Sequence, residues 1–479
     1  MRMKAVKLAR AARWVLSLSL VFGVLAARGE ALEKPVKVYI LAGQSNMVGI
    51  GQVTGGGSRW GSEFIDPVVS VYPGAYDPKA NYDVLKPTNT LKLESFGGVK
   101  PTPYPGGGTH VVRGFVQPKA TGVYEFRPGY GGSTHNIMQV DGKEVYRKEV
   151  GKEAEHKQLK LTAGQKVPFK ITYVTEQADG LGWIVRTDIP GTLETVVKTD
   201  GKFKYLIDDD GKWIQRDDVW YKGVVTAGAN KWLSIGCGAG SNSIGPELGF
   251  GHVMGNHHDE PVLILKASQG NRSLAWDFLP PESKRYEREG KVYAGYKDSP
   301  GSWNKGTEPK PINWYAGKQY DDCFGAAHQV LDNFDTEFPH FKDRGYEIAG
   351  FVWWQGHKDT GSEIYAKRYE QNLVHLIKTL RREFKSPSAP FVIGTIGFGG
   401  REMSGNTLTV ANAQLAVSGD KGKYPEFQGN VKTVETRDFW READVSPRNQ
   451  GFHYNQNAET YMLVGEALGR AMLDLLPGK

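Results

Sequence analysis

The sequence predicts an α/β protein in which a parallel sheet, wrapped by helices, is interrupted by an antiparallel β-sandwich. After residue 230, apolar runs of strand length alternate with helical segments, as in parallel sheets covered by helices. The region from about residue 93 to 190 instead has short alternating runs between glycine turns, which is typical of a sandwich. The apolar run Val36 to Leu41 precedes this region but has the composition of the later strands.

The first 31 residues have the layout of a secretory signal peptide. They contain six Lys or Arg residues and one Glu, and the apolar stretch Trp14 to Ala27 is short for a membrane-spanning helix. We expect the mature chain to begin near Leu32 and to be secreted or periplasmic; an uncleaved membrane anchor is the alternative. Without this segment the formal net charge falls from +7 to +2. Because no basic run remains, we do not expect nucleic acid as a partner.

The core strands and helices follow from apolar spacing. Four buried strands are expected after residue 230: Trp232 to Ile235, Pro261 to Lys266, Ile348 to Trp354 and Phe391 to Ile396. One helix face is predicted from the spacing of Tyr369, Leu373, Leu376 and Leu380, and a terminal helix is expected over 458–475.

The sandwich is predicted to be an insertion into a surface loop of this core. Similar fragments, Asn89-Thr90-Leu91 and Gly191-Thr192-Leu193, lie on either side of it. The expected domains are therefore a core made of 32–92 and 191–479, with 93–190 inserted. Exposed loops tolerate such insertions.

Cysteines and histidines give no sign of a metal site or a cofactor. Only Cys237 and Cys323 occur, which excludes a disulfide scaffold and a four-cysteine site but leaves their pairing open. A local cluster is explained more simply by a turn, because its spacing matches none of the usual zinc patterns; it comprises His252, His257, His258 and Asp259.

A serine stands where the first strand turns toward a helix, in the run Ala42-Gly43-Gln44-Ser45-Asn46-Met47-Val48. The carboxyl end of a parallel sheet is where α/β folds gather reactive groups, so Ser45 is the candidate nucleophile. The alternative is that Ser45 only caps the helix. His453, just before the terminal helix, is the candidate base, because serine needs a base within hydrogen-bond reach.

With these motifs the chain resembles the SGNH hydrolases, and within them the sialate O-acetylesterase-like and family 6 carbohydrate esterases. Their first block reads Gly-Gln-Ser-Asn-Met, as residues 43–47 do here. The second block is matched by Gly245 before Pro246, and the third by Trp353-Trp354-Gln355-Gly356. The resemblance implies a three-layer α/β/α core and an oxyanion hole made by the N–H groups of Ser45 and Gly245 with the Gln355 side-chain amide.

The fourth block departs from the family pattern. The family usually has Asp-x-x-His, whereas Gln450 stands three residues before His453. A glutamine can orient the imidazole but brings no charge to stabilise the imidazolium. Three explanations are open: a Ser-His dyad oriented by Gln450 or a backbone carbonyl, an acid from elsewhere in the chain, or a degenerate site. The nearest upstream acids are Asp438, Glu442 and Asp444.

The inserted region resembles PA14-like sandwiches, which often accompany carbohydrate-active enzymes. The matching segments include Gly114-Phe115-Val116, Gly122 to Phe126 and Val140 to Lys143. The paired aspartates that bind calcium in the sugar-binding members are not evident around Tyr130 to Ser133. Shaping the active-site cleft and binding a ligand are both consistent with this resemblance.

Together the motifs and resemblances predict an exported serine esterase that removes O-acetyl groups from carbohydrate, either acetylated polysaccharide or sialic acid. The acetyl and carbohydrate specificity is implied by the resemblance, since the residues alone indicate only a serine-hydrolase-like site. One alternative is a catalytically inert carbohydrate-binding or adhesion protein. Another is an esterase that acts on lipid or aryl esters.

Overall fold

The computed structural model describes residues 34–54, 58–59, 63–73, 76–92, 108–127, 135–175 and 183–477. The expected signal peptide at 1–31 and the segment Tyr130 to Ser133 lie outside these residues. Over the described ranges, no helix is both long enough and apolar enough to span a membrane.

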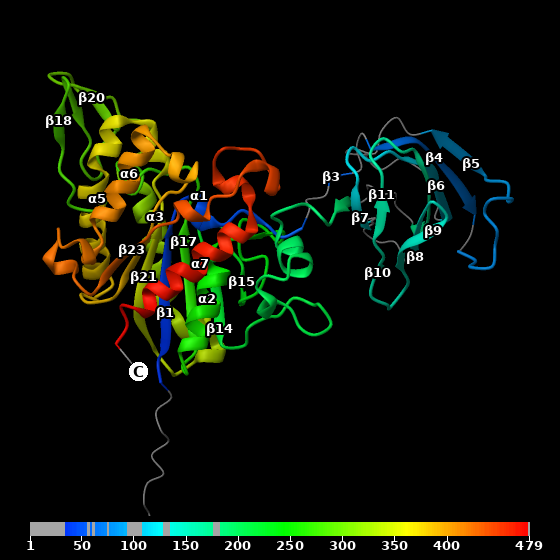
Figure 1. The fold of residues 1–479 in the computed structure, drawn as a ribbon, viewed down its shortest axis with the longest axis horizontal. Helices are drawn as coiled ribbons and strands as arrows, with labels where there is room; N and C mark the ends of the chain where they lie inside the picture. Colours follow the sequence, from blue (N-terminus) through cyan, green and yellow to red (C-terminus); the bar gives the residue numbers. More distant parts are fainter. Residues whose placement is uncertain are drawn as a thin grey trace, which may run out of the picture.

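A seven-stranded sheet forms the centre of the α/β part (Figure 1). Its order is β15-β14-β17-β1-β21-β22-β23, and every pair is parallel except β14 with the edge strand β15. The strands are β1 (Val36–Gly43), β14 (Val219–Val224), β15 (Asn230–Trp232), β17 (Val262–Ser268), β21 (Tyr346–Trp354), β22 (Phe391–Gly394) and β23 (Val431–Val434).

Both faces of this sheet are buried, as the near-continuous apolar strands require. In β1, Ile40 packs into the hydrophobic cluster on one face and Leu41 into the cluster on the other. The first face is covered by α3 (Lys318–Asp332), α5 (Glu363–Glu383) and α6 (Gly405–Ala416). The second is covered by α2 (Pro246–His257) and α7 (Ala458–Leu473). The predicted three-layer α/β/α architecture is confirmed.

Helices α2 and α7 approach closely at two glycines. A Cβ on Gly249 would lie 2.7 Å from the carbonyl oxygen of Met462, and one on Gly465 would lie 2.3 Å from that of Pro246. Any larger residue at these places would separate the helices. This contact fixes α7 against α2, and the segment that carries His453 leads directly into α7.

One edge of the sheet differs from the prediction. The strand expected at Trp232 to Ile235 is wrong, because only Asn230–Trp232 is a strand, and it pairs antiparallel with β14 at the edge. The parallel strand next to β17 is β14, whose lysine and glycine interrupt the apolar run and obscure its period. Cys237 and Cys323 are free buried thiols in the clusters on opposite faces, so they do not pair.

The sandwich consists of two antiparallel sheets, which Figure 1 shows to the side of the core. One has the order β10-β9-β8-β12-β6-β4-β5, and the other β11-β7-β13-β3. Residues before 93 already belong to the first sheet, since β4 pairs with both β5 and β6. The strands are β3 (Ser58–Arg59), β4 (Phe64–Pro73), β5 (Asn89–Lys92), β6 (Gly108–Val116), β7 (Gly122–Arg127), β8 (His135–Val140), β9 (Lys143–Lys148), β10 (Glu155–His156), β11 (Leu159–Leu161), β12 (Val167–Thr175) and β13 (Trp183–Arg186).

Three smaller groups complete the strands and helices that bear on the site. The pair β2 (Gly51–Gln52) and β16 (Ser243–Ile244) joins the chain after Ser45 to the chain before α2. A hairpin sheet contains β18 (Tyr286–Arg288), β19 (Lys291–Tyr293) and β20 (Ser302–Asn304). The short helices α1 (Ser45–Val48) and α4 (Phe334–Glu337) follow β1 and α3.

Candidate active site

Ser45 is the first residue of α1 and follows the end of β1, at the carboxyl edge of the parallel sheet. The corner before it requires glycine, because Gly43 has φ +154° and a Cβ there would lie 2.2 Å from the carbonyl oxygen of Trp354. A second glycine leaves space beside the serine, since a Cβ on Gly270 would lie only 3.7 Å from that of Ser45. Ser45 itself is half-buried, with its neighbours Gln44 and Asn46 buried.

His453 lies in hydrogen-bond contact with Ser45, although 408 residues separate them in the sequence. The distance from His453 Nε2 to Ser45 Oγ is 2.8 Å. The two side chains predicted to act as nucleophile and base are therefore neighbours in the fold. Their catalytic roles stay a prediction, but the contact is the geometry that proton transfer from a serine requires.

A strained turn holds His453 in this place. Four consecutive residues, His453 to Gln456, have φ between +48° and +59°, a left-handed conformation that costs roughly 1–2 kcal/mol per residue. The side chain of Asn455 compensates: its Oδ1 accepts from the N–H groups of Gln450 and Gly451, and its Nδ2 donates to the Arg441 carbonyl. Strain of this kind is typical of functional sites.

None of the predicted acids contacts His453. Asp438 forms a bidentate ion pair with Arg401, and Glu442 accepts from the Trp440 indole. Gln450 contributes only its backbone N–H, to Asn455. Of the three explanations left by the sequence, orientation by Gln450 and an acid from Asp438 or Glu442 both lack the necessary contact.

The remaining predicted acid, Asp444, forms no hydrogen bond or ion pair with the imidazole either; its segment, Ala443–Val445, is a 3₁₀ turn. Burial, together with the smaller effect of the neighbouring His357, lowers the pKa of His453 to about 4. The imidazole is therefore neutral at pH 7, in the form that can accept a proton from serine.

Two of the three predicted oxyanion donors are already occupied. The Gly245 N–H, expected to face outward, donates to Glu247 Oε1 at 2.8 Å. The Gln355 amide is fully buried, and its Nε2 donates to Asp359 Oδ2 at 2.7 Å and to the Arg272 carbonyl at 2.8 Å. An amide has only two N–H protons. In this structure both donors are directed to protein acceptors, and the predicted oxyanion-hole roles of Gly245 and Gln355 stay a prediction.

The Ser45 N–H remains as the available predicted donor. Within the described residues it has no hydrogen-bond acceptor, as the first N–H of a helix normally lacks an intrahelical partner. Such a group can bind the oxygen of a bound ester.

Beneath α1 lies a fully buried ion pair. Lys266 Nζ is 2.9 Å from Glu247 Oε2, and both side chains have zero exposure. The ammonium group also donates to the carbonyls of Val48 at 2.8 Å and Cys237 at 3.0 Å. The pair thus ties together β17, the end of α1 and the start of α2, where Glu247 also holds Gly245.

A second buried carboxylate organises the other wall. Asp359 accepts from the N–H groups of Leu274 and Ala275 as well as from Gln355, and burial raises its pKa to about 6. These bonds fix the chain that continues from Gly270, beside Ser45. Gln44 Oε1 completes the wall by accepting from the Gly356 and Lys358 N–H groups, and it lies 3.2 Å from Gln355 Nε2.

Sequence reasoning missed the supporting carboxylates and gave Lys266 no role at the site. Lys266 lies in the expected buried strand Pro261 to Lys266, and its side chain is buried beneath α1. A signal was present, because a lysine inside an apolar strand is rarely buried without a partner. Glu247 follows Gly245 in the second motif, and Asp359 follows Gln355 in the third. Nothing in the sequence shows that these carboxylates accept hydrogen bonds from the Gly245 N–H and the Gln355 amide.

The histidine cluster is divided between α2 and the residues that follow it. His252 lies within α2, where burial lowers its pKa to about 4, and His258 ends that helix with a 2.7 Å contact to the Tyr39 hydroxyl. Among the described residues, no group of three or more His, Cys, Asp or Glu side chains could hold a metal ion.

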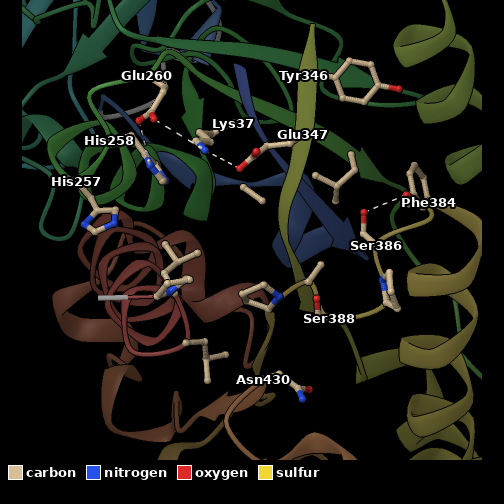
Figure 2. A pocket seen from close by; sticks show the side chains of 18 of the residues that line it. Lys37, His257, His258, Glu260, Tyr346, Glu347, Phe384, Ser386, Ser388 and Asn430 are labelled. Carbon is tan, nitrogen blue, oxygen red and sulfur yellow. Dashed lines mark hydrogen bonds and ion pairs between the residues drawn. The ribbon is translucent and has the colours of Figure 1, made fainter. Parts of the chain in front are cut away.

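A cavity of about 1020 Å³ lies at the opposite end of the sheet, near the amino ends of β1 and β21 (Figure 2). Its charged side chains pair with one another: Lys37 is 2.6 Å from Glu347 and 4.0 Å from Glu260. Neither Ser45 nor His453 lines it. Because parallel sheets place reactive groups at their carboxyl ends, this cavity is not the candidate active site.

Comparison with known families identifies both the α/β part and the sandwich. The family of carbohydrate esterases described as sialic acid-specific acetylesterases matches residues 235–474, half of the chain. The chain belongs to this family. The match contains Gly245, Gln355 and His453, whereas Ser45 precedes it. The PA14 domain family matches residues 76–211, which confirms the resemblance of the sandwich.

Solved structures similar to this member of the sialic acid-specific acetylesterase family are distant in sequence. A carbohydrate acetylesterase from Xanthomonas citri is 13% identical, with 76% of this chain and 70% of that chain covered and a TM-score of 0.34. The structure titled NanS is 14% identical, with 54% and 88% covered and a TM-score of 0.31. A protein from Arabidopsis thaliana is 16% identical, with 55% and 88% covered and a TM-score of 0.33. No curated protein matches the chain.

Removing the buried ammonium should destabilise the protein strongly. Lys266→Met leaves the Glu247 carboxylate buried without its partner, which costs about 3–5 kcal/mol. We expect the free energy of unfolding, measured by urea denaturation, to fall by that amount. The double variant Lys266→Met, Glu247→Leu should recover most of it. Lys37→Met, which breaks a partly exposed pair, is the control; equal losses in Lys266→Met and Lys37→Met would contradict the assignment.

Asn455→Ala should disturb the turn that carries His453. The change leaves two N–H groups and one carbonyl without their partner, so we expect a loss of about 2 kcal/mol in unfolding free energy. Ester turnover should fall at least about tenfold, because a small displacement of a base lowers rates steeply. Asn333→Ala, which removes one exposed bond, is the control for both assays. Full activity in Asn455→Ala would show that the turn does not position His453.

Proposed function

We propose that this protein is a secreted or periplasmic serine esterase that removes O-acetyl groups from carbohydrate, with Ser45 as nucleophile and His453 as base. The observation that carries the proposal is the 2.8 Å contact between Ser45 Oγ and His453 Nε2 at the carboxyl edge of the sheet. The esterase class comes from the family. The acetyl group, the carbohydrate and the residue roles are the proposed part.

In the proposed reaction the Ser45 hydroxyl donates its proton to His453 Nε2 while Oγ attacks the acetyl carbonyl. The tetrahedral oxyanion is bound by the Ser45 N–H. The imidazolium then gives the proton to the leaving sugar oxygen, and the acetyl group stays on Ser45. Water, deprotonated by the same imidazole, releases acetate and restores the serine.

The corner beside Ser45 suits a small acyl group. Gly270 presents no side chain toward the Ser45 Cβ, and the chain around it is held by Asp359. We propose that an acetyl group occupies this space. A steep preference for long acyl chains over acetate would favour the alternative of a lipid esterase.

The domain arrangement is also part of the proposal. We place the signal peptide at 1–31 and treat the PA14 domain as an insertion between β2 and β14, with 93–190 as its expected core. The strands β4 and β5 extend its sheet toward residue 64. The first and second parts of the esterase domain then meet at the Ser45–His453 contact.

Ser45→Ala should abolish ester cleavage and leave the fold intact, because it removes only the half-buried hydroxyl. The measurement is acetate release from acetylated polysaccharides and sialic acids by wild type and variant in parallel, with circular dichroism as the folding control. Unchanged turnover in the folded variant would contradict the proposal. If neither protein releases acetate, the inert carbohydrate-binding alternative is favoured. That alternative is also motivated by the lack of a carboxylate in contact with His453 among the described residues.

The dependence of kcat/KM on pH should have its acid limb near pH 4 instead of near 6.5. His453 must be neutral to accept a proton, and its pKa is lowered to about 4, so activity is lost only as pH falls through that value. Gln450→Asp restores the family's Asp-x-x-His pattern, but the side chain at 450 is exposed and does not contact the imidazole, so we expect the limb to stay near pH 4. Gln450→Asn is the uncharged control. An acid limb at 6.5 in wild type would contradict the lowered pKa.

A further inference from the structure

Phe452 is an exposed aromatic residue at the candidate active site. It immediately precedes His453, and 37% of its surface is accessible. Its ring centroid lies 4.5 Å from that of the His453 imidazole, at an interplanar angle of 64°. An aromatic ring left open to solvent beside a catalytic imidazole is in position to contact a substrate bound to Ser45.

The Phe452 ring is supported from the core by a chain of ring contacts. His357 stacks on it at 5.8 Å and 26°, and Phe398 meets His357 edge-on at 4.8 Å. Phe398 in turn contacts Tyr454 at 5.1 Å, and these last two side chains are only 7% and 0% exposed. Because each ring rests on the next, the surface that Phe452 presents is fixed.

The supported ring presents an apolar, uncharged face. Burial lowers the pKa of His357, and the adjacent Lys358 lowers it further, so the supporting imidazole is uncharged at neutral pH. Lys358 follows His357 in the sequence and Gln450 precedes Phe452 by two residues, and both are exposed polar residues. A flat apolar face matches the apolar C–H face of a pyranose ring.

We propose that Phe452 is a binding platform for the sugar ring of the substrate, on which the ring stacks while its O-acetyl group reaches Ser45. This inference rests on the proposed function and adds the group that recognises the alcohol part of the ester. In this proposal the acetyl carbonyl lies at Ser45 Oγ, so the group that meets the Phe452 ring is the alcohol part of the ester.

The test compares two acetyl esters that differ in the alcohol. One is an O-acetylated pyranoside, supplied as acetylated methyl glucopyranoside and as O-acetyl sialic acid; the other is ethyl acetate, which has no ring. For each variant the ratio of kcat/KM between the sugar ester and ethyl acetate is measured. Phe452→Leu removes the ring and keeps an apolar side chain, and Phe452→Trp keeps a ring. Val445→Ala is the control, an exposed apolar residue of the same segment outside the ring contacts.

In Phe452→Leu we expect the ratio to fall about fivefold or more, through a higher KM for the sugar ester, which is the size of one lost aromatic contact. Phe452→Trp and Val445→Ala should keep the wild-type ratio. If the ratio of kcat/KM between the sugar ester and ethyl acetate in Phe452→Leu stays within twofold of the wild-type ratio, the proposal is overturned. Equal losses on both esters would also overturn it, since Phe452 would then only support His453. If wild type cleaves neither ester, the proposed function itself fails, and the platform with it.

Discussion

The buried ion pair between Lys266 and Glu247 is the interaction on which the site depends. One ammonium group holds the last carbonyl of the nucleophile helix, a carbonyl of the loop before α2 and the carboxylate of α2 itself. That carboxylate also takes the Gly245 N–H. Two charges fully removed from water are tolerated only when such bonds satisfy them. The pair therefore fixes where Ser45 stands relative to the sheet, and it does so at the cost of a donor that family resemblance assigned to catalysis.

On the opposite side of Ser45, a second motif residue, Gln355, also donates to protein acceptors instead of offering a free N–H. The Gln355 amide belongs to a network in which Asp359 and the Arg272 carbonyl accept its two N–H protons, and Gln44 accepts from the neighbouring backbone N–H groups. Its carbonyl oxygen accepts from Tyr369, which also contacts the Gln355 backbone. A motif residue here holds the loops around the nucleophile in place. Motif identity thus predicts the location of a residue more reliably than the atom to which its hydrogen bond goes.

The sequence was sufficient for the α/β core, because β1, β17, β21 and β22 are continuous apolar runs and α5 has a clear helical period. The sequence was also sufficient to predict that Ser45 and His453 lie close together, since Ser45 follows the first core strand and His453 precedes the terminal helix. It did not predict β14, where Lys222 and Gly223 break the apolar pattern. It also placed the start of the sandwich too late, because β4 precedes residue 93, where the alternating apolar pattern begins. It could not show the bonds of Glu247 and Asp359, which depend on burial and on partners far away in the chain.

The separation of 408 residues between Ser45 and His453 has a consequence for biosynthesis. Ser45 is made among the first residues of the core, whereas His453 is made only after the PA14 domain, the strands of the central sheet and the α2 helix. The contact between them can therefore form only late in synthesis, once nearly all of the α/β part has been made.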